Sequence, residues 1–150
     1  MISDVMHIGL TVLDLDRSVA FYRDVLGLAY QGELVMEGPA TDRLFGRPDS
    51  RARVAYLSRG TTLNSPPVEL IQFTCHHPEQ QRTELFRTSI SELCFVTDDI
   101  QREYERLSAL GVEFLSPPQE FDFTSDGFGK SRAVYLRDPD GIILELMQPL

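Results

Sequence analysis

Four polar side chains occupy equivalent positions in the two halves of this chain, and together they could hold a metal ion: His7, Glu69, Glu92 and Glu145. Glu69 and Glu145 interrupt segments that are otherwise apolar and strand-like. A carboxylate on a buried strand face is unfavourable unless it is paired, protonated or bound to a metal. Because imidazole and carboxylate groups are ordinary ligands of first-row metals, the set predicts one divalent-cation site shared by the two halves.

The ligand types narrow the choice of metal. Three oxygen donors, one nitrogen donor and no sulfur favour a five- or six-coordinate ion, with water completing the shell. The candidates are Ni, Co, Mn, Fe, Zn and Mg. Taken singly, each residue also has a structural explanation, such as a solvent-facing glutamate at the end of a strand. The recurrence of the four positions in register favours the shared site.

The elements that must position these residues form an internal repeat. The segments that begin at His7 and Glu92, 85 residues apart, alternate apolar and polar residues as strands do. Each runs into the apolar stripe of an amphipathic helix. The stripes are Leu15, Val19, Tyr22 and Val25, and then Ile100, Tyr104, Leu107 and Leu110. Asp16 and Asp99 are predicted to cap these helices, and Gly27 and Gly111 to end them.

Three extended segments follow each helix. They are expected at Leu28–Leu34, Arg53–Ser58 and Val68–Phe73 in the first half, and at Val112–Leu115, Arg132–Leu136 and Leu144–Pro149 in the second. The sequence therefore predicts two βαβββ modules, 1–73 and 90–150, joined by a linker at 74–89. Modules of about 70 residues bury little core alone, so one compact α+β fold is expected. Residues 37–51 and 116–131 are expected to be long loops.

Composition excludes several classes of protein. The 150 residues carry 14 Lys and Arg against 23 Asp and Glu, a formal charge of −9. This balance argues against nucleic acid and against an anionic membrane surface as partners. No stretch is long and apolar enough to span a membrane, and Met1–Asp4 does not open a secretory signal, so a cytoplasmic location is expected. Cys75 and Cys94 match no disulfide or zinc pattern, and Cys94 is predicted to be a small core residue.

Several motifs together resemble the vicinal oxygen chelate superfamily, which includes glyoxalase I, methylmalonyl-CoA epimerase, extradiol dioxygenases and bleomycin resistance proteins. The first motifs are His7–Leu10, Asp16–Tyr22 and Leu26–Leu28. The others are Phe95–Ile100, Leu110–Val112 and Asp138–Gly141 leading into Leu144–Leu146. The resemblance spans nearly the whole chain. It is specific for the superfamily and weak for any one reaction.

This resemblance implies two βαβββ modules that form a cupped, barrel-like mixed sheet around a divalent metal, with helices outside. The implied ligands are His7, Glu69, Glu92 and Glu145. Metal-dependent members usually carry His where this chain has Glu92, so Glu92 either binds the ion or points away from it. The implied reaction is that of a lyase or isomerase, which moves a proton through a metal-stabilised enolate of a small oxygenated substrate. Glu145 is the first candidate for the base and Glu69 the second.

Two other functions remain open. An extradiol-type dioxygenase generally needs a second histidine ligand. His76 and His77 lie in the predicted linker and are expected to be surface residues, which disfavours this reading. A non-catalytic binding or resistance protein is the other alternative. The resemblance also implies a homodimer, in which one chain or two could supply each site.

The two predicted loops carry residues that could contact substrate. Four arginines in or beside the first loop could steer a small anionic substrate, or could be ordinary solvated charges: Arg43, Arg47, Arg51 and Arg53. The second loop combines aromatic residues with two glycines and a lysine: Phe121, Phe123, Gly127, Phe128, Gly129 and Lys130. It is expected to cover the site as a lid or to pack against a partner subunit.

Overall fold

The computed structural model describes residues 5–60 and 67–150, and the chain divides into two compact units, Met1–Gln80 and Gln81–Leu150. The boundary between the units falls inside the segment 74–89 that was predicted as a linker. Met1–Asp4, on which the prediction about a secretory signal depends, lies outside the described residues. No helix of the described chain is long and apolar enough to cross a membrane.

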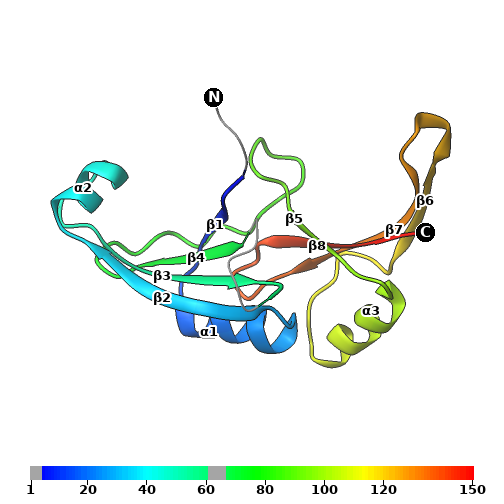
Figure 1. Cartoon of the computed structure of the whole chain (residues 1–150), viewed down its shortest axis with the longest axis horizontal. Coiled ribbons are helices and arrows are strands. Elements are labelled where there is room, and N and C mark those ends of the chain that lie inside the picture. Colours follow the sequence, from blue (N-terminus) through cyan, green and yellow to red (C-terminus); the bar gives the residue numbers. More distant parts are fainter. Residues whose placement is uncertain (1–4, 61–66) are drawn as a thin grey trace. The chain divides into compact units, whose positions relative to one another are not determined.

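The first unit builds an open four-stranded mixed sheet in the order β1-β4-β3-β2 (Figure 1). Strand β1 runs parallel to β4, and the other neighbours are antiparallel. Its elements are β1 (Ile8–Thr11), α1 (Leu15–Ala20), the π-helical segment η1 (Phe21–Val25), β2 (Ala29–Glu37), α2 (Pro39–Phe45), β3 (Arg51–Ser58) and β4 (Val68–Phe73).

The second unit repeats this topology in a second open sheet, β5-β8-β7-β6, in which β5 runs parallel to β8. Its elements are β5 (Leu93–Val96), α3 (Ile100–Ala109), β6 (Gln119–Phe123), the 3-10 turn η2 (Thr124–Asp126), β7 (Gly129–Arg137) and β8 (Ile143–Pro149). The predicted α+β class and the internal repeat are confirmed.

Each unit packs one face of its sheet against its helix. In the first unit this face buries Leu10, Val12, Leu15, Tyr22 and Leu70. In the second unit it buries Leu93, Ile100, Leu107, Leu136 and Leu144. Leu15, Tyr22, Ile100 and Leu107 of the two predicted stripes are therefore core residues, whereas Leu110 lies past the end of α3 and is 60% exposed. The first helix changes from α to π at Phe21.

A glutamine at the same place in the last strand of each module fixes the start of each helix. Gln72 donates to the carbonyl of Leu13 at 3.0 Å and accepts from the Leu15 amide at 3.3 Å. Gln148 makes the same pair of bonds around Ile100, at 2.9 and 3.1 Å. These bonds show that Gln72 and Gln148 point to the helix side of their strands. Residues next to them in sequence therefore point to the opposite face.

Four local predictions were wrong. Asp14, not Asp16, caps α1, because its side chain accepts the Arg17 amide; the predicted cap at Asp99 is confirmed. Residues 37–51 hold the helix α2, which begins at Pro39 and ends at the left-handed Gly46. Residues 116–131 form a β6–β7 hairpin instead of a loop. The strand expected at Val112–Leu115 is reduced to a single bridge between Phe114 and Leu136 of β7, and β6 pairs with the preceding part of β7, Gly129–Ala133.

Candidate functional site

Strand register brings a tyrosine, a glutamate and a glycine together in the first unit. Glu69 of β4 lies opposite Gly9 of β1 on one side and Tyr56 of β3 on the other. His7 precedes β1 by one residue and projects to the same face as Gly9. This face is the one opposite to α1, since Gln72 of β4 points toward the helix. The sheet thus places His7 and Glu69 side by side.

The contacts hold the Glu69 carboxylate from two sides. His7 Nε2 lies 3.3 Å from Glu69 Oε2, and the Tyr56 hydroxyl donates to Glu69 Oε1 at 2.5 Å. The His7 and Tyr56 rings meet edge to face, with 6.1 Å between their centroids. Glu69 is only 8% exposed, whereas the His7 side chain is 41% exposed. The carboxylate is therefore fixed in place, and the imidazole beside it remains accessible.

This geometry suits two ligands of one metal ion. Bonds of about 2.1 Å at tetrahedral or octahedral angles place neighbouring ligand atoms about 3.0 to 3.4 Å apart. The 3.3 Å between His7 Nε2 and Glu69 Oε2 lies in that range. Ligating carboxylates are also commonly held by a second hydrogen bond, as Tyr56 holds Glu69. The chemistry and spacing of this pair fit a divalent cation.

Because Gly9 has no side chain, it leaves room for the Glu69 carboxylate. A methyl group at position 9 would lie 3.1 Å from Glu69 Oε2 and 3.5 Å from the Ile71 side chain. Such a contact is closer than a carbon and an oxygen normally approach, so the carboxylate would have to move. A glycine in a strand often marks a place where another group approaches closely, and here that group is the carboxylate.

Tyr56 stays protonated over the range in which proteins work. Burial, together with the hydrogen bond to Glu69 and the charge of that residue, raises the pKa of Tyr56 to about 12. A neutral hydroxyl can donate to the Glu69 carboxylate, as the short bond shows. Tyr56 thus holds this carboxylate in place beside His7.

The second unit repeats the arrangement with different residues. Glu145 of β8 lies between Cys94 of β5 and Tyr135 of β7, in the same register as Glu69 with its neighbours. Glu145 is 8% exposed, as Glu69 is. Glu92 precedes β5 by one residue, where His7 precedes β1. The predicted equivalence of the four positions therefore holds in the sheets themselves.

The electrostatics of the second unit show that its acidic groups share one face. Partial burial of the thiol, hydrogen bonding to Glu145 and the charge of Glu92 raise the pKa of Cys94 to about 12. Burial and the charges of Glu145 and Glu92 also raise the pKa of Tyr135. The prediction that Cys94 is a core residue was wrong, because Cys94 is exposed on the face opposite to α3. Its place on β5 is the one that Gly9 takes on β1.

The structure thus describes the four predicted ligands as two pairs, each in its own unit. His7 and Glu69 are in contact, and Glu92 and Glu145 both act on Cys94. Within residues 5–60 and 67–150, no three His, Cys, Asp or Glu side chains lie close enough together to hold a metal ion. The site of four ligands remains a prediction.

Sequence reasoning missed Tyr56 and Tyr135. They lie 79 positions apart, in equivalent places on the third strands of the two modules. The repeat could have indicated them, because Arg53 and Arg132 have the same offset. Which strand neighbour each tyrosine meets depends on the register between strands.

The four arginines have separate roles. Arg51 pairs with Glu37 at 3.0 Å, and Arg53 pairs with Asp16 and Glu33 at 2.9 and 2.7 Å. The hydrogen bonds that Arg53 donates to Asp16 and Glu33 raise the pKa of its guanidinium. Arg43 and Arg47 make no side-chain ion pair within the described chain. A steering role for all four was predicted as one possibility, and only Arg43 and Arg47 keep an unpaired charge for it.

Comparison with known proteins identifies what the chain is similar to. The model of the Glyoxalase/Bleomycin resistance protein/Dioxygenase superfamily matches residues 5–146. A 2-epi-5-epi-valiolone epimerase from Actinomyces sp is 31% identical over 150 aligned positions, which cover 95% of this chain and 78% of that protein. Metallothiol transferase FosB from Shouchella clausii is 26% identical over 148 positions, 97% of this chain and 80% of that protein.

Solved structures share the fold. A glyoxalase family protein from Bacillus cereus superposes with a TM-score of 0.84 at 20% identity, covering 100% of this chain and 96% of that one. The trypanothione-dependent glyoxalase I of Leishmania major superposes with a TM-score of 0.67 at 18% identity, covering 97% and 86%.

Proposed function

Because this chain belongs to the Glyoxalase/Bleomycin resistance protein/Dioxygenase superfamily, we propose that it is a metal-dependent lyase or isomerase that moves a proton in a small oxygenated substrate. The observation that carries the proposal is the contact between His7 and Glu69. His7 Nε2 lies 3.3 Å from Oε2 of the Glu69 carboxylate, which is buried. An epimerase relative that aligns with 95% of the chain supports this reaction class.

The ion would be held by His7 and Glu69 of the first unit and by Glu145 of the second, with Glu92 as a fourth ligand. When bound, a divalent cation supplies Lewis-acid polarisation of a substrate oxygen. The three carboxylates give the ligand set a formal charge of −3, so an ion with charge +2 leaves the site net anionic. We also propose that the protein is a cytoplasmic homodimer; ligands from one chain or from two copies would suit the same four residues.

The two buried glutamates differ in how firmly they are held, and this difference supports separate roles for them in the proposal. Glu69 accepts the strong Tyr56 hydrogen bond and contacts His7, which suits a ligand that must not move. Among the described residues no comparable hydrogen bond holds Glu145: the Cys94 thiol beside it is a weaker donor and makes its own contact with the Phe95 carbonyl at 3.9 Å. Glu145 is therefore freer to leave a ligand position and take the proton from the carbon next to the substrate oxygen.

Metal uptake is the first test. Protein purified without chelators is expected to contain a divalent ion, and calorimetric titration after chelation should show about one site per chain. Glu69→Gln and His7→Ala should each weaken binding about tenfold or more. His77→Ala, which removes an exposed imidazole, is the matched control and should leave binding unchanged. If the native chain takes up no ion, the proposal is wrong and a non-catalytic binding protein is favoured.

Proton exchange is the second test. Incubation in D₂O with 2-epi-5-epi-valiolone, the compound in the name of the epimerase relative, and with other small hydroxyketones should exchange a proton next to the carbonyl. Glu145→Gln should abolish the exchange, whereas Glu105→Gln on the exposed face of α3 should not. Exchange that persists in Glu145→Gln would remove Glu145 from the role of base. Oxygen consumption with Fe(II) and a catechol would instead indicate a dioxygenase.

Glu92 has a test of its own. If Glu92 is a ligand, Glu92→His should shift the preference of the site toward softer ions such as Zn²⁺. An unchanged order of metal affinities would place Glu92 outside the coordination shell.

A further inference from the structure

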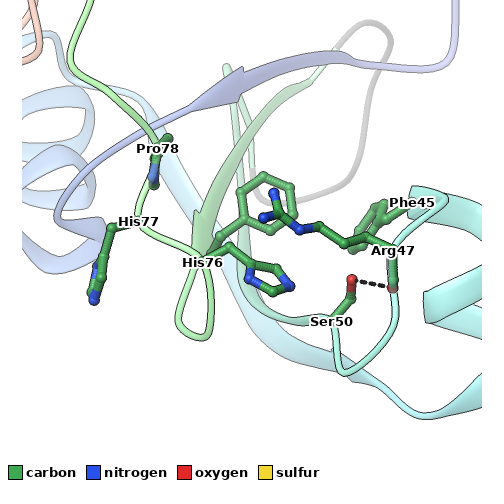
Figure 2. Close-up of a pocket in the computed structure, with 7 residues that line it drawn as sticks. Phe45, Arg47, Ser50, His76, His77 and Pro78 are labelled. Atoms are coloured by element: carbon green, nitrogen blue, oxygen red, sulfur yellow. Dashed lines mark hydrogen bonds between the residues drawn. The ribbon is translucent and has the colours of Figure 1, made fainter.

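The first unit contains a pocket that the four predicted ligands do not line. It has a volume of about 310 Å³ and lies between the end of α2, the start of β3 and the segment after β4 (Figure 2). Its lining residues are Phe45, Arg47, Ser50, Phe73, His76, His77 and Pro78. These residues lie within Met1–Gln80, so the first unit forms the pocket by itself.

Two nitrogen-bearing side chains at the pocket lack partners. His76 Nε2 is buried and has no hydrogen-bond partner in the described part of the chain. A buried polar atom of this kind is unfavourable unless a ligand or a water pairs with it. The Arg47 guanidinium likewise makes no ion pair with any described residue. Figure 2 shows the His76 ring on the side of the pocket where Arg47 lies, while His77 points away.

The charges around the pocket favour an anion. No aspartate or glutamate is among its lining residues. The carboxylate of Asp42 accepts the Ser50 amide at 2.8 Å, so the turn before β3 already engages it. The Ser50 hydroxyl is likewise committed to the Arg47 carbonyl at 2.7 Å. The groups left for a ligand are the guanidinium of Arg47 and the imidazole of His76, which suit a carboxylate.

Apolar surface supplies the rest of the lining. The rings of Phe45 and Phe73 form one wall of the pocket. Their centroids are 5.3 Å apart and their planes are inclined at 74°, an edge-to-face pair. Pro78 adds a further apolar surface. A dry cavity of about 150 Å³ is large enough for a benzene molecule. A pocket of about 310 Å³ therefore has room for an aromatic ring and a carboxylate together.

We propose that this pocket binds a small carboxylic acid with an aromatic or branched apolar body, the carboxylate on Arg47 and His76 and the body against Phe45 and Phe73. Phe73 lies on the same face of β4 as Glu69, four residues further along, which is about 13 Å at the rise of a strand. A carboxylic acid bound beside Phe73 does not contact the residues proposed to hold the metal. This proposal therefore does not depend on the proposed function.

Titration with benzoate tests the proposal. In protein labelled at histidine nitrogens, benzoate should shift the His76 resonances in a saturable way while those of His7 stay in place, both without and with EDTA. Arg47→Gln should weaken benzoate binding about fivefold to tenfold, the loss expected for one partly exposed charge-assisted hydrogen bond. Arg43→Gln removes the same charge from α2 outside the pocket and should leave binding unchanged.

Two further probes complete the test. Benzyl alcohol has a similar shape without the charge, and inorganic phosphate has the charge without the ring. Both should bind more weakly than benzoate. Equal binding of benzyl alcohol would show that the pocket recognises only apolar surface and would overturn the proposal. Stronger binding of phosphate, benzoate binding that disappears with EDTA, or no shift at His76 with any probe would overturn it as well.

Discussion

The hydrogen bond from Tyr56 to Glu69 makes a quantitative prediction about the candidate site. Tyr56→Phe removes the hydroxyl and keeps the ring, so the packing against His7 should survive. The bond is short at 2.5 Å, and its acceptor is a carboxylate that is 8% exposed. A hydrogen bond to a charged group contributes about 1.5 to 3 kcal/mol, and water reaches this acceptor poorly once the hydroxyl is gone. We expect the free energy of unfolding to fall by about 1.5 to 3 kcal/mol.

One assay checks this free energy of unfolding, and a second checks the effect of Tyr56 on metal affinity. In a unit of this size each kcal/mol corresponds to about 2 to 8 °C, so thermal unfolding with EDTA present should show a midpoint at least about 3 °C lower. Calorimetric titration with Mn²⁺ or Zn²⁺ should show affinity about 10- to 100-fold weaker, as is usual when the group that holds a metal ligand is removed.

Tyr135→Phe provides the matched control. Tyr135 takes the same place beside Glu145, but no hydrogen bond between the two is described. Its hydroxyl should therefore contribute less to stability and to metal affinity. Equal losses in the two variants, or no loss in Tyr56→Phe, would refute the reasoning that Tyr56 holds Glu69 in place.

Further predictions concern Gly9, the thiol of Cys94 and the two glutamines at the helix starts. Gly9→Ala places a methyl group 3.1 Å from Glu69 Oε2, so metal affinity measured by calorimetry should fall about tenfold while the circular dichroism spectrum stays native. The pKa of the Cys94 thiol is raised from 9.0 to about 12, so at pH 8 Cys94 should react with iodoacetamide at least about a hundredfold more slowly in native than in unfolded protein. Mass spectrometry measures the rate of alkylation. Equal rates in the two states would contradict the prediction. Because the raised pKa favours the protonated thiol, the stability that Cys94 contributes is complete below pH 9 and lost as the pH rises toward 12. Gln72→Ala and Gln148→Ala should each lower the free energy of unfolding by about 1 to 3 kcal/mol in urea titrations, since each removes two bonds at a helix start.

Much of the fold could be predicted because its signals are local. The alternation around Leu10 and Leu93 and the stripes through Leu15 and Ile100 follow from the periods of strands and helices alone. The offset of 85 residues between His7 and Glu92 identified the repeat and hence the equivalent positions. One error lies where two local signals compete. Asp14 and Asp16 both suit an N-cap, and only the backbone at Asp14 has the extended conformation that a cap requires.

The sequence by itself therefore determined the two modules, the superfamily resemblance and the residue types that could bind a cation. Only the tertiary structure decided which side chains meet. Tyr56 reaches Glu69 because antiparallel pairing sets them opposite each other across 13 positions of chain, and one step in register would have turned Tyr56 to the helix side. Cys94 faces outward for the same reason, opposite Glu145. The pocket between Arg47 and His76 likewise depends on how α2 folds back beside the end of β4, where ring packing between Phe45 and Phe73 brings distant segments together. Periodicity assigns a residue to a face, and strand register and packing decide its neighbours.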